Sequence, residues 1–211
     1  MPVNSKSPLA RSAKVLAAGA LAFLLVAMAD SGPARDELLA EIQHLQDQLT
    51  ARQGELELAR IHLDRLTAIV SQSARHDIPA DLASAIYDTA LEEGVEPKLA
   101  FSLVRVESRF TDDAVSSAGA VGLTQVMPST AFWLDPDIGY DDLFRGETNL
   151  RLGFRYLHRM IRQYHGQLDL ALLAYNRGPT RVDSIIRAGG NPSNGYERAV
   201  LRGAGDASSP R

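Results

Sequence analysis

The stretch PKLAFSLVRVESRF, residues 97–110, has apolar residues at the spacing of an amphipathic helix. Leu103 and Phe110 share one face of this predicted helix with Glu107, so a carboxylate interrupts an apolar stripe. The two arginines of the stretch lie two residues from Glu107 and point elsewhere. Burial without a cationic partner raises the pKa of a carboxyl group, as a general acid needs near neutral pH. Pairing of Glu107 with an arginine from another part of the chain is the alternative interpretation.

Helical patterns on both sides of this stretch predict a mainly α domain over residues 78–202. A helix over residues 81–93 is expected to end at Gly94, and Pro97 suits the first turn of the next helix. Further helices are expected at 128–134, 147–164, 168–176, 179–188 and 195–202. Residues 71–79 are predicted to form a short linker before the domain. The apolar-poor tail, residues 203–211, is predicted to be disordered.

A heptad pattern precedes the domain and predicts a coiled-coil helix over residues 35–70. Apolar residues alternate in steps of four and three, and Arg52 is the one exception. Such a seam would make the protein an oligomer or bind it to a helical partner. A long amphipathic helix that folds back on the domain is the alternative. The ten seam positions are Leu38, Ile42, Leu45, Leu49, Arg52, Leu56, Ala59, Leu63, Leu66 and Val70.

The N-terminus has the pattern of an export signal over residues 1–29. Three basic residues precede the apolar run at 15–29, which is too short for a typical membrane span. Ala27-Met28-Ala29 fits a small-x-small cleavage site. Retention of the run as an uncleaved anchor in the inner membrane is the alternative. Either way, the sequence predicts an exported protein of the periplasm or cell envelope.

Composition excludes several kinds of chemistry. There is no cysteine, so a Cys nucleophile, a disulfide and a thiolate metal site are all absent. The five histidines show no metal-ligand spacing, and we expect neither a metal nor a cofactor. The formal charge is −4, and removal of residues 1–29 leaves 19 basic and 26 acidic residues. Binding of nucleic acid through bulk charge is therefore not expected.

Three motifs occur in order around and after Glu107. Val106-Glu107-Ser108 is followed by SSAGAVGLTQVMP at residues 116–128, and AYNRGP occupies residues 174–179. Together they closely resemble the soluble lytic transglycosylase family, whose members have a goose-type lysozyme-like fold and cleave bacterial peptidoglycan. The resemblance extends over about residues 78–202. It includes LFRGETNLRLGFRYL at 143–157, with its Asn, Gly and Tyr-Leu pair, and the late GYERAVL at 195–201.

The resemblance implies a role for each matching residue. Glu107 corresponds to the single catalytic acid/base. Gln125 and Asn176 are implied to be hydrogen-bond partners of the sugar or the acid. Thr124 and Arg177 depart from the family pattern, which puts subsite preference in doubt. The residues implied to line the groove or orient the scissile bond are Ser116, Gln125, Met127, Tyr175, Asn176 and Tyr196.

Two aromatic residues after the second motif, Phe132 and Trp133, are expected in the core or at the groove rim rather than on substrate.

The expected chemistry follows from a single motif carboxylate. Ordinary glycosidases use two carboxylates, whereas a substrate-assisted enzyme needs one. Asp112 and Asp113 lie in a polar segment that predicts a solvated turn. The resemblance implies cleavage of the MurNAc-GlcNAc β-1,4 bond by Glu107, with formation of 1,6-anhydro-MurNAc. A muramidase that uses water, and a non-catalytic glycan-binding adaptor assembled by the coiled coil, are the alternatives.

Overall fold

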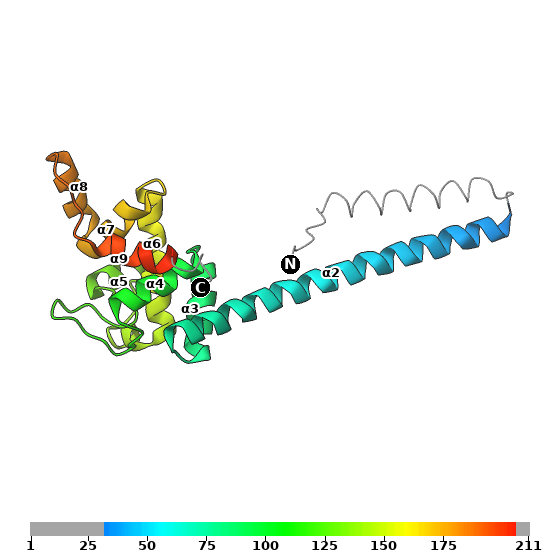
Figure 1. Cartoon of the computed structure of the whole chain (residues 1–211), viewed down its shortest axis with the longest axis horizontal. Coiled ribbons are helices and arrows are strands. Elements are labelled where there is room, and N and C mark those ends of the chain that lie inside the picture. Colours follow the sequence, from blue (N-terminus) through cyan, green and yellow to red (C-terminus); the bar gives the residue numbers. More distant parts are fainter. Residues whose placement is uncertain (1–31, 206–211) are drawn as a thin grey trace, which may run out of the picture. The chain divides into compact units, whose positions relative to one another are not determined.

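The computed structural model describes residues 32–205, and this range is mostly helical, with isolated bridges but no extended strand (Figure 1). The export segment expected at residues 1–29 lies outside the described range, as do residues 206–211. No helix within the described range is long and apolar enough to cross a membrane. The helices are α2 (Pro33–His76), α3 (Ala80–Glu92), α4 (Pro97–Glu107), α5 (Pro128–Leu134), the 3-10 helix η1 (Asp141–Phe144), α6 (Gly146–Gln163), α7 (Leu168–Arg177), α8 (Pro179–Arg187) and α9 (Tyr196–Gly205).

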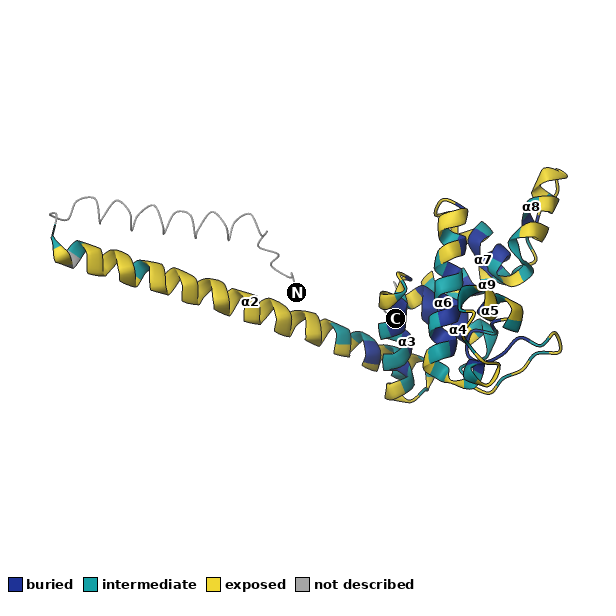
Figure 2. Ribbon diagram, turned by 180° about the vertical axis from the view of Figure 1, so that it is seen from behind, coloured by how far each residue is buried: buried dark blue, intermediate teal, exposed yellow. Residues whose placement is uncertain are grey.

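The chain divides after Asp64 into two compact units. In the first unit, the heptad positions of α2 are largely open to solvent, and Leu49 and Leu56 are exposed over 60% and 70% of their surface. Figure 2 shows this part of α2 as almost uniformly exposed. A coiled-coil partner for this seam stays a prediction.

The predicted linker at residues 71–79 is wrong over most of its length, because α2 continues to His76. The last turns of α2 have a second stripe of their own, which packs within the second unit. Ile69 is buried in the core there, and the ring of His76 stacks on Phe101 at 5.8 Å between centroids. Only the turn from Asp77, whose φ is +52°, to Pro79 separates α2 from α3.

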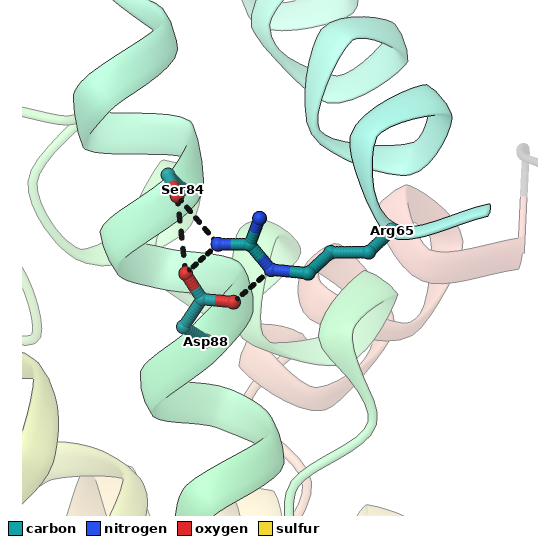
Figure 3. Close-up of polar contacts among 3 residues, drawn as sticks. All are labelled: Arg65, Ser84 and Asp88. Carbon is teal, nitrogen blue, oxygen red and sulfur yellow. Dashed lines mark hydrogen bonds and ion pairs between the residues drawn. The ribbon is translucent and has the colours of Figure 1, made fainter. Parts of the chain in front are cut away.

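A polar cluster fixes this end of α2 to α3 (Figure 3). Arg65 donates through its Nε to Asp88 at 2.7 Å and through a terminal nitrogen to Ser84 at 3.1 Å. The hydrogen bond from Arg65 lowers the pKa of Asp88. The last turns of α2 therefore pack on the domain through residues outside the heptad seam, and the fold-back of the seam itself stays a prediction.

The core of the second unit is built around α6, the longest helix that lies wholly within it, and α6 contacts α3, α5, α7 and η1. Figure 2 shows buried segments of α4, α6 and α7 facing one another. Phe101, Phe154 and Leu172 are among the fully buried side chains. The helix ends follow the sequence prediction. Gly94 closes α3 with φ +70° while Val95 N donates to Ala90 O, and Pro97 opens α4.

The last helix extends further than expected. α9 includes residues 203–205, which the sequence placed in a disordered tail. Its first turn packs toward the end of α4, since α4 and α9 are in extensive contact. The carboxyl end of α4, the amino end of α9 and the end of α7 therefore meet in one region of the second unit.

Candidate active site

Glu107 is the last residue of α4 and faces a cavity of about 460 Å³. Burial raises the pKa of Glu107 from its ordinary value of 4.5 to about 7. The hydroxyl of Tyr196 donates a hydrogen bond to Oε1 of Glu107, which opposes part of this rise in pKa. Glu107 forms no ion pair with any residue between 32 and 205, so the alternative of an arginine partner is wrong for this range.

The structure brings all seven sequence-predicted site residues together. Six of them line the cavity, and Tyr196 contacts Glu107 directly from the start of α9. The cavity is formed by the end of α4, the loop after it, α5, α6 and the end of α7. Its lining residues are Glu107, Ser116, Ala118, Ala120, Gln125, Val126, Met127, Thr130, Tyr156, Tyr175, Asn176, Arg177 and Gly178.

The loop of residues 114–126 forms one wall of the cavity and is held by its own hydrogen bonds. Ser116 Oγ accepts from Ala120 N at 3.0 Å. The side-chain nitrogen of Gln125 donates to the carbonyl oxygens of Ala114 at 3.1 Å and Gly122 at 3.0 Å. Gln125 lies in the left-handed region, with φ +49°. Part of its hydrogen-bonding capacity therefore serves the loop, in addition to any contact with sugar.

The side chain of Asn149, in α6, holds this loop by hydrogen bonds. Its side-chain nitrogen donates to Val121 O and Leu143 O at 2.8 Å each, and its side-chain oxygen accepts from Thr124 N at 2.9 Å and from Thr124 Oγ1 at 2.7 Å. All four bonds are buried. A buried polar side chain with every group satisfied fixes one geometry for the loop.

Thr124 is wholly buried and does not line the cavity. The expectation that its side chain affects subsite preference is therefore corrected. A Cβ at Gly153 would stand 2.3 Å from Thr124 Oγ1, so this glycine is what lets α6 approach the loop closely. The Asn and Gly of the 143–157 segment are thus structural supports of the site.

Tyr175 connects α7 to the same loop. Its hydroxyl donates to Thr124 O at 2.8 Å, and burial raises the pKa of Tyr175 well above its usual range, so the hydroxyl stays protonated. The ring lies 5.4 Å from that of Tyr156. The next residue, Asn176, also lines the cavity, and its Oδ1 accepts from Asn194 at 3.0 Å.

Tyr156 and Thr130 line the cavity but were not proposed as site residues from the sequence. Tyr156 belongs to the Tyr-Leu pair of the 143–157 segment, and its partner Leu157 is wholly buried. Because neighbouring helical residues point in different directions, that pair already indicated that one member leaves the core.

Trp133 and Phe132 are exposed over 54% and 40% of their surface, so a core position is wrong for both, and a place at the groove rim stays a prediction. Neither lines the cavity of Glu107.

Glu107 is the only carboxylate among the residues that line its cavity. Asp112 and Asp113 are exposed in the turn that follows α4, as the sequence predicted. A second carboxylate on the opposite side of a bound glycosidic bond, which ordinary glycosidases need, is not supplied by the lining.

Comparisons with known proteins agree with this arrangement. The model of the Transglycosylase SLT domain family matches residues 84–195. The soluble lytic murein transglycosylase of Salmonella typhimurium is 35% identical over 94 residues, which are 42% of this chain and 15% of that protein. A putative soluble lytic murein transglycosylase of Haemophilus influenzae is 34% identical over 114 residues, 51% of this chain and 19% of that protein. This chain therefore spans less than a fifth of the length of either relative.

Solved structures give the same result. An inactive mutant of the lytic transglycosylase Slt from Pseudomonas aeruginosa superposes with a TM-score of 0.52 and 29% identity, over 61% of this chain and 24% of that one. The 70-kDa soluble lytic transglycosylase in complex with bulgecin A gives a TM-score of 0.54 and 25% identity, over 63% of this chain and 24% of that one. The family match covers more than half of the chain, including Glu107 and the loop it faces. The chain belongs to the Transglycosylase SLT domain family.

Proposed function

We propose that this chain is a peptidoglycan lytic transglycosylase that cleaves the MurNAc-GlcNAc β-1,4 bond with formation of 1,6-anhydro-MurNAc. The observation that carries the proposal is a single carboxyl group with a pKa of about 7 in a cavity whose lining contains no second carboxylate. The names of the relatives, which are murein transglycosylases, support the substrate class.

In the first step, protonated Glu107 donates its proton to the glycosidic oxygen. A pKa near 7 leaves about half of the molecules protonated at neutral pH, which suits both proton donation and later proton acceptance. The hydroxyl of Tyr196 occupies Oε1, so Oε2 is the oxygen that carries the transferable proton. Tyr196 itself remains protonated, because burial raises its pKa well above the usual range.

As the bond breaks, the N-acetyl group of MurNAc stabilises positive charge at C1 in place of a protein nucleophile. The ionised Glu107 then removes the proton of the C6 hydroxyl, whose oxygen bonds to C1. An internal hydroxyl next to C1 has a very high effective concentration compared with a diffusing water. Ser116, Met127, Tyr175 and Asn176 line the cavity and are proposed to hold the sugar in this geometry.

Analysis of the product ends tests this proposal. Digestion of purified peptidoglycan is expected to give MurNAc ends that lack one water, as detected by mass spectrometry. Reducing MurNAc ends would instead show that Glu107 activates water and that the protein is a muramidase. Glycan binding without cleavage would favour the non-catalytic adaptor.

The setting of this activity is also a proposal. A role in cell-wall remodelling fits a peptidoglycan substrate, and the sequence pattern of residues 1–29 supports export to the periplasm or cell envelope. Self-association through the seam of residues 38–70, or capture of a helical partner, is supported by the exposed leucines of α2.

A further inference from the structure

Two further cavities extend the site along α5 and α6. The nearer one, of about 350 Å³, shares Thr130 and Tyr156 with the cavity of Glu107. The farther one, of about 830 Å³, shares Trp133, Arg159 and Gln163 with the nearer one. Because each cavity shares lining residues with the next, the three cavities are neighbours along α6, and the first of them contains Glu107. We call the other two cavities the α6 groove.

The α6 groove is lined by arginines in a chain of net negative charge. Arg155 is neutralised by Glu93, with contacts of 2.7 and 3.1 Å. Arg159 and Arg162 are exposed and form no ion pair with any residue that the structure describes. Exposed Glu92 is the other acidic lining residue. The groove therefore has one more positive than negative side chain.

Trp133 and Arg159 form a pair on the groove wall. The guanidinium carbon of Arg159 lies 4.3 Å from the centroid of the Trp133 ring, which is more than half exposed. A guanidinium stacked on a ring keeps its N–H groups free to bind a carboxylate in its plane. The exposed part of the indole offers an apolar surface beside that charge. A ligand with carboxylates separated by short apolar side chains matches both features.

We propose that the α6 groove binds the anionic peptide stem of peptidoglycan while the glycan strand occupies the cavity of Glu107. This inference rests on the proposed function. The sugar rings of a peptidoglycan strand are neutral once the lactyl group of MurNAc is amidated, so its negative charges lie in the peptide. Arg159 and Arg162 pair with stem carboxylates, and Trp133 packs on the stem's apolar part. The groove thus selects stem-bearing over stem-free glycan.

Binding to two matched ligands tests this inference. The ligands are a GlcNAc-MurNAc tetrasaccharide that carries tetrapeptide stems and the same tetrasaccharide without stems. The Glu107→Gln variant of the chain is used because it should not cleave the ligands, and calorimetry gives each Kd. The stem-bearing ligand is expected to bind several-fold more tightly. Addition of Arg159→Gln and Arg162→Gln is expected to weaken its binding by about tenfold, because each exposed ion pair supplies a few-fold in affinity. Binding of the stem-free ligand should not change.

The control is Arg151→Gln, on the same helix but outside the lining of these cavities. It should leave both affinities unchanged. Added salt should reduce the preference for the stem-bearing ligand. Equal affinity for the two ligands, or equal weakening of both by the arginine changes, would overturn the inference and assign the groove to neutral glycan. Failure of the unmodified chain to cleave either ligand would instead count against the proposed function, so the two failures are distinguishable.

Discussion

The first part of α2 and the loop of residues 114–126 use apolar and polar residues in opposite ways. In residues 38–63 of α2, leucines recur at heptad positions and remain exposed. In the loop, the hydrogen bonds made by Asn149, Gln125 and Ser116 are buried or half-buried. The helix has a surface that lacks a partner within its own unit. The loop is completed by contacts within the second unit. A repeating sequence pattern thus predicts a surface for another helix, whereas a functional site depends on contacts between residues that are distant in the sequence.

The largest effect is expected from Glu107→Gln, which removes the only carboxyl group among the residues that line the cavity. Glycan cleavage should fall by at least about a hundredfold, since general acid-base catalysis contributes that much or more. The circular dichroism spectrum should be unchanged, because the amide has nearly the same shape as the carboxyl group. Turnover is measured on purified peptidoglycan. Activity close to that of the unmodified chain in a folded variant would disprove the assignment of Glu107.

The pH dependence of the free energy of unfolding of Glu107→Gln gives a second test. Because the pKa of Glu107 is higher in the folded than in the unfolded protein, proton binding by Glu107 contributes to the free energy of unfolding. This contribution is fully present below the ordinary pKa of 4.5 and is lost as the pH rises through about 7. At pH 8, Glu107→Gln should therefore be more stable than the unmodified chain by up to about 3 kcal/mol, at 1.36 kcal/mol per pKa unit. At about pH 4, below the ordinary pKa of 4.5, the difference should nearly vanish. Equal differences at both values would mean that the pKa of Glu107 is not raised.

Asn149→Ala should destabilise the loop of residues 114–126, which the Asn149 side chain holds by hydrogen bonds. The change removes four buried hydrogen bonds and leaves Val121 O, Leu143 O and the Thr124 amide without this partner. We expect a loss of about 3 kcal/mol in the free energy of unfolding, in addition to reduced cleavage. Urea denaturation provides the measurement. As a control, Asn191→Ala at an exposed loop position should cost well under 1 kcal/mol. A similar cost for both would refute the role of Asn149.

A smaller effect, on self-association of the protein, is expected from Leu56→Asp in the exposed first part of α2. A charge at a seam position should weaken self-association by about tenfold or more. Sedimentation of the intact protein over a range of concentrations measures this. Leu58→Asp is the matched control, because Leu58 is similarly exposed on α2 but lies outside the seam. Equal behaviour of the two variants would show that the heptad pattern does not direct association.

Local signals in the sequence were sufficient for the elements and for most of the site. Gly94 and Pro97 fixed the boundary between α3 and α4, since a left-handed cap and a first-turn proline act within a few residues. The three motifs identified six residues that line one cavity, and the later segment of residues 195–201 identified Tyr196, which contacts Glu107.

Features that depend on distant contacts could not be predicted. Thr124 was expected to affect subsite preference because it departs from the family pattern within the motif, but its hydroxyl donates to Asn149, 25 residues later. The linker prediction failed because the heptad pattern ends near Val70, whereas Ile69 and His76 keep the helix intact by packing on the domain. Neither partner of such contacts can be recognised from its own neighbourhood in the sequence.

The exposed position of Trp133 has a practical consequence. It is the only tryptophan in the chain, so the tryptophan fluorescence of the protein comes from one place, beside Arg159 in the α6 groove. A ligand that covers the indole there should shift its emission to shorter wavelength, whereas unfolding should change it little, because more than half of the side chain already meets water. The protein thus contains a natural optical probe of groove occupancy that needs no label and is nearly silent on folding.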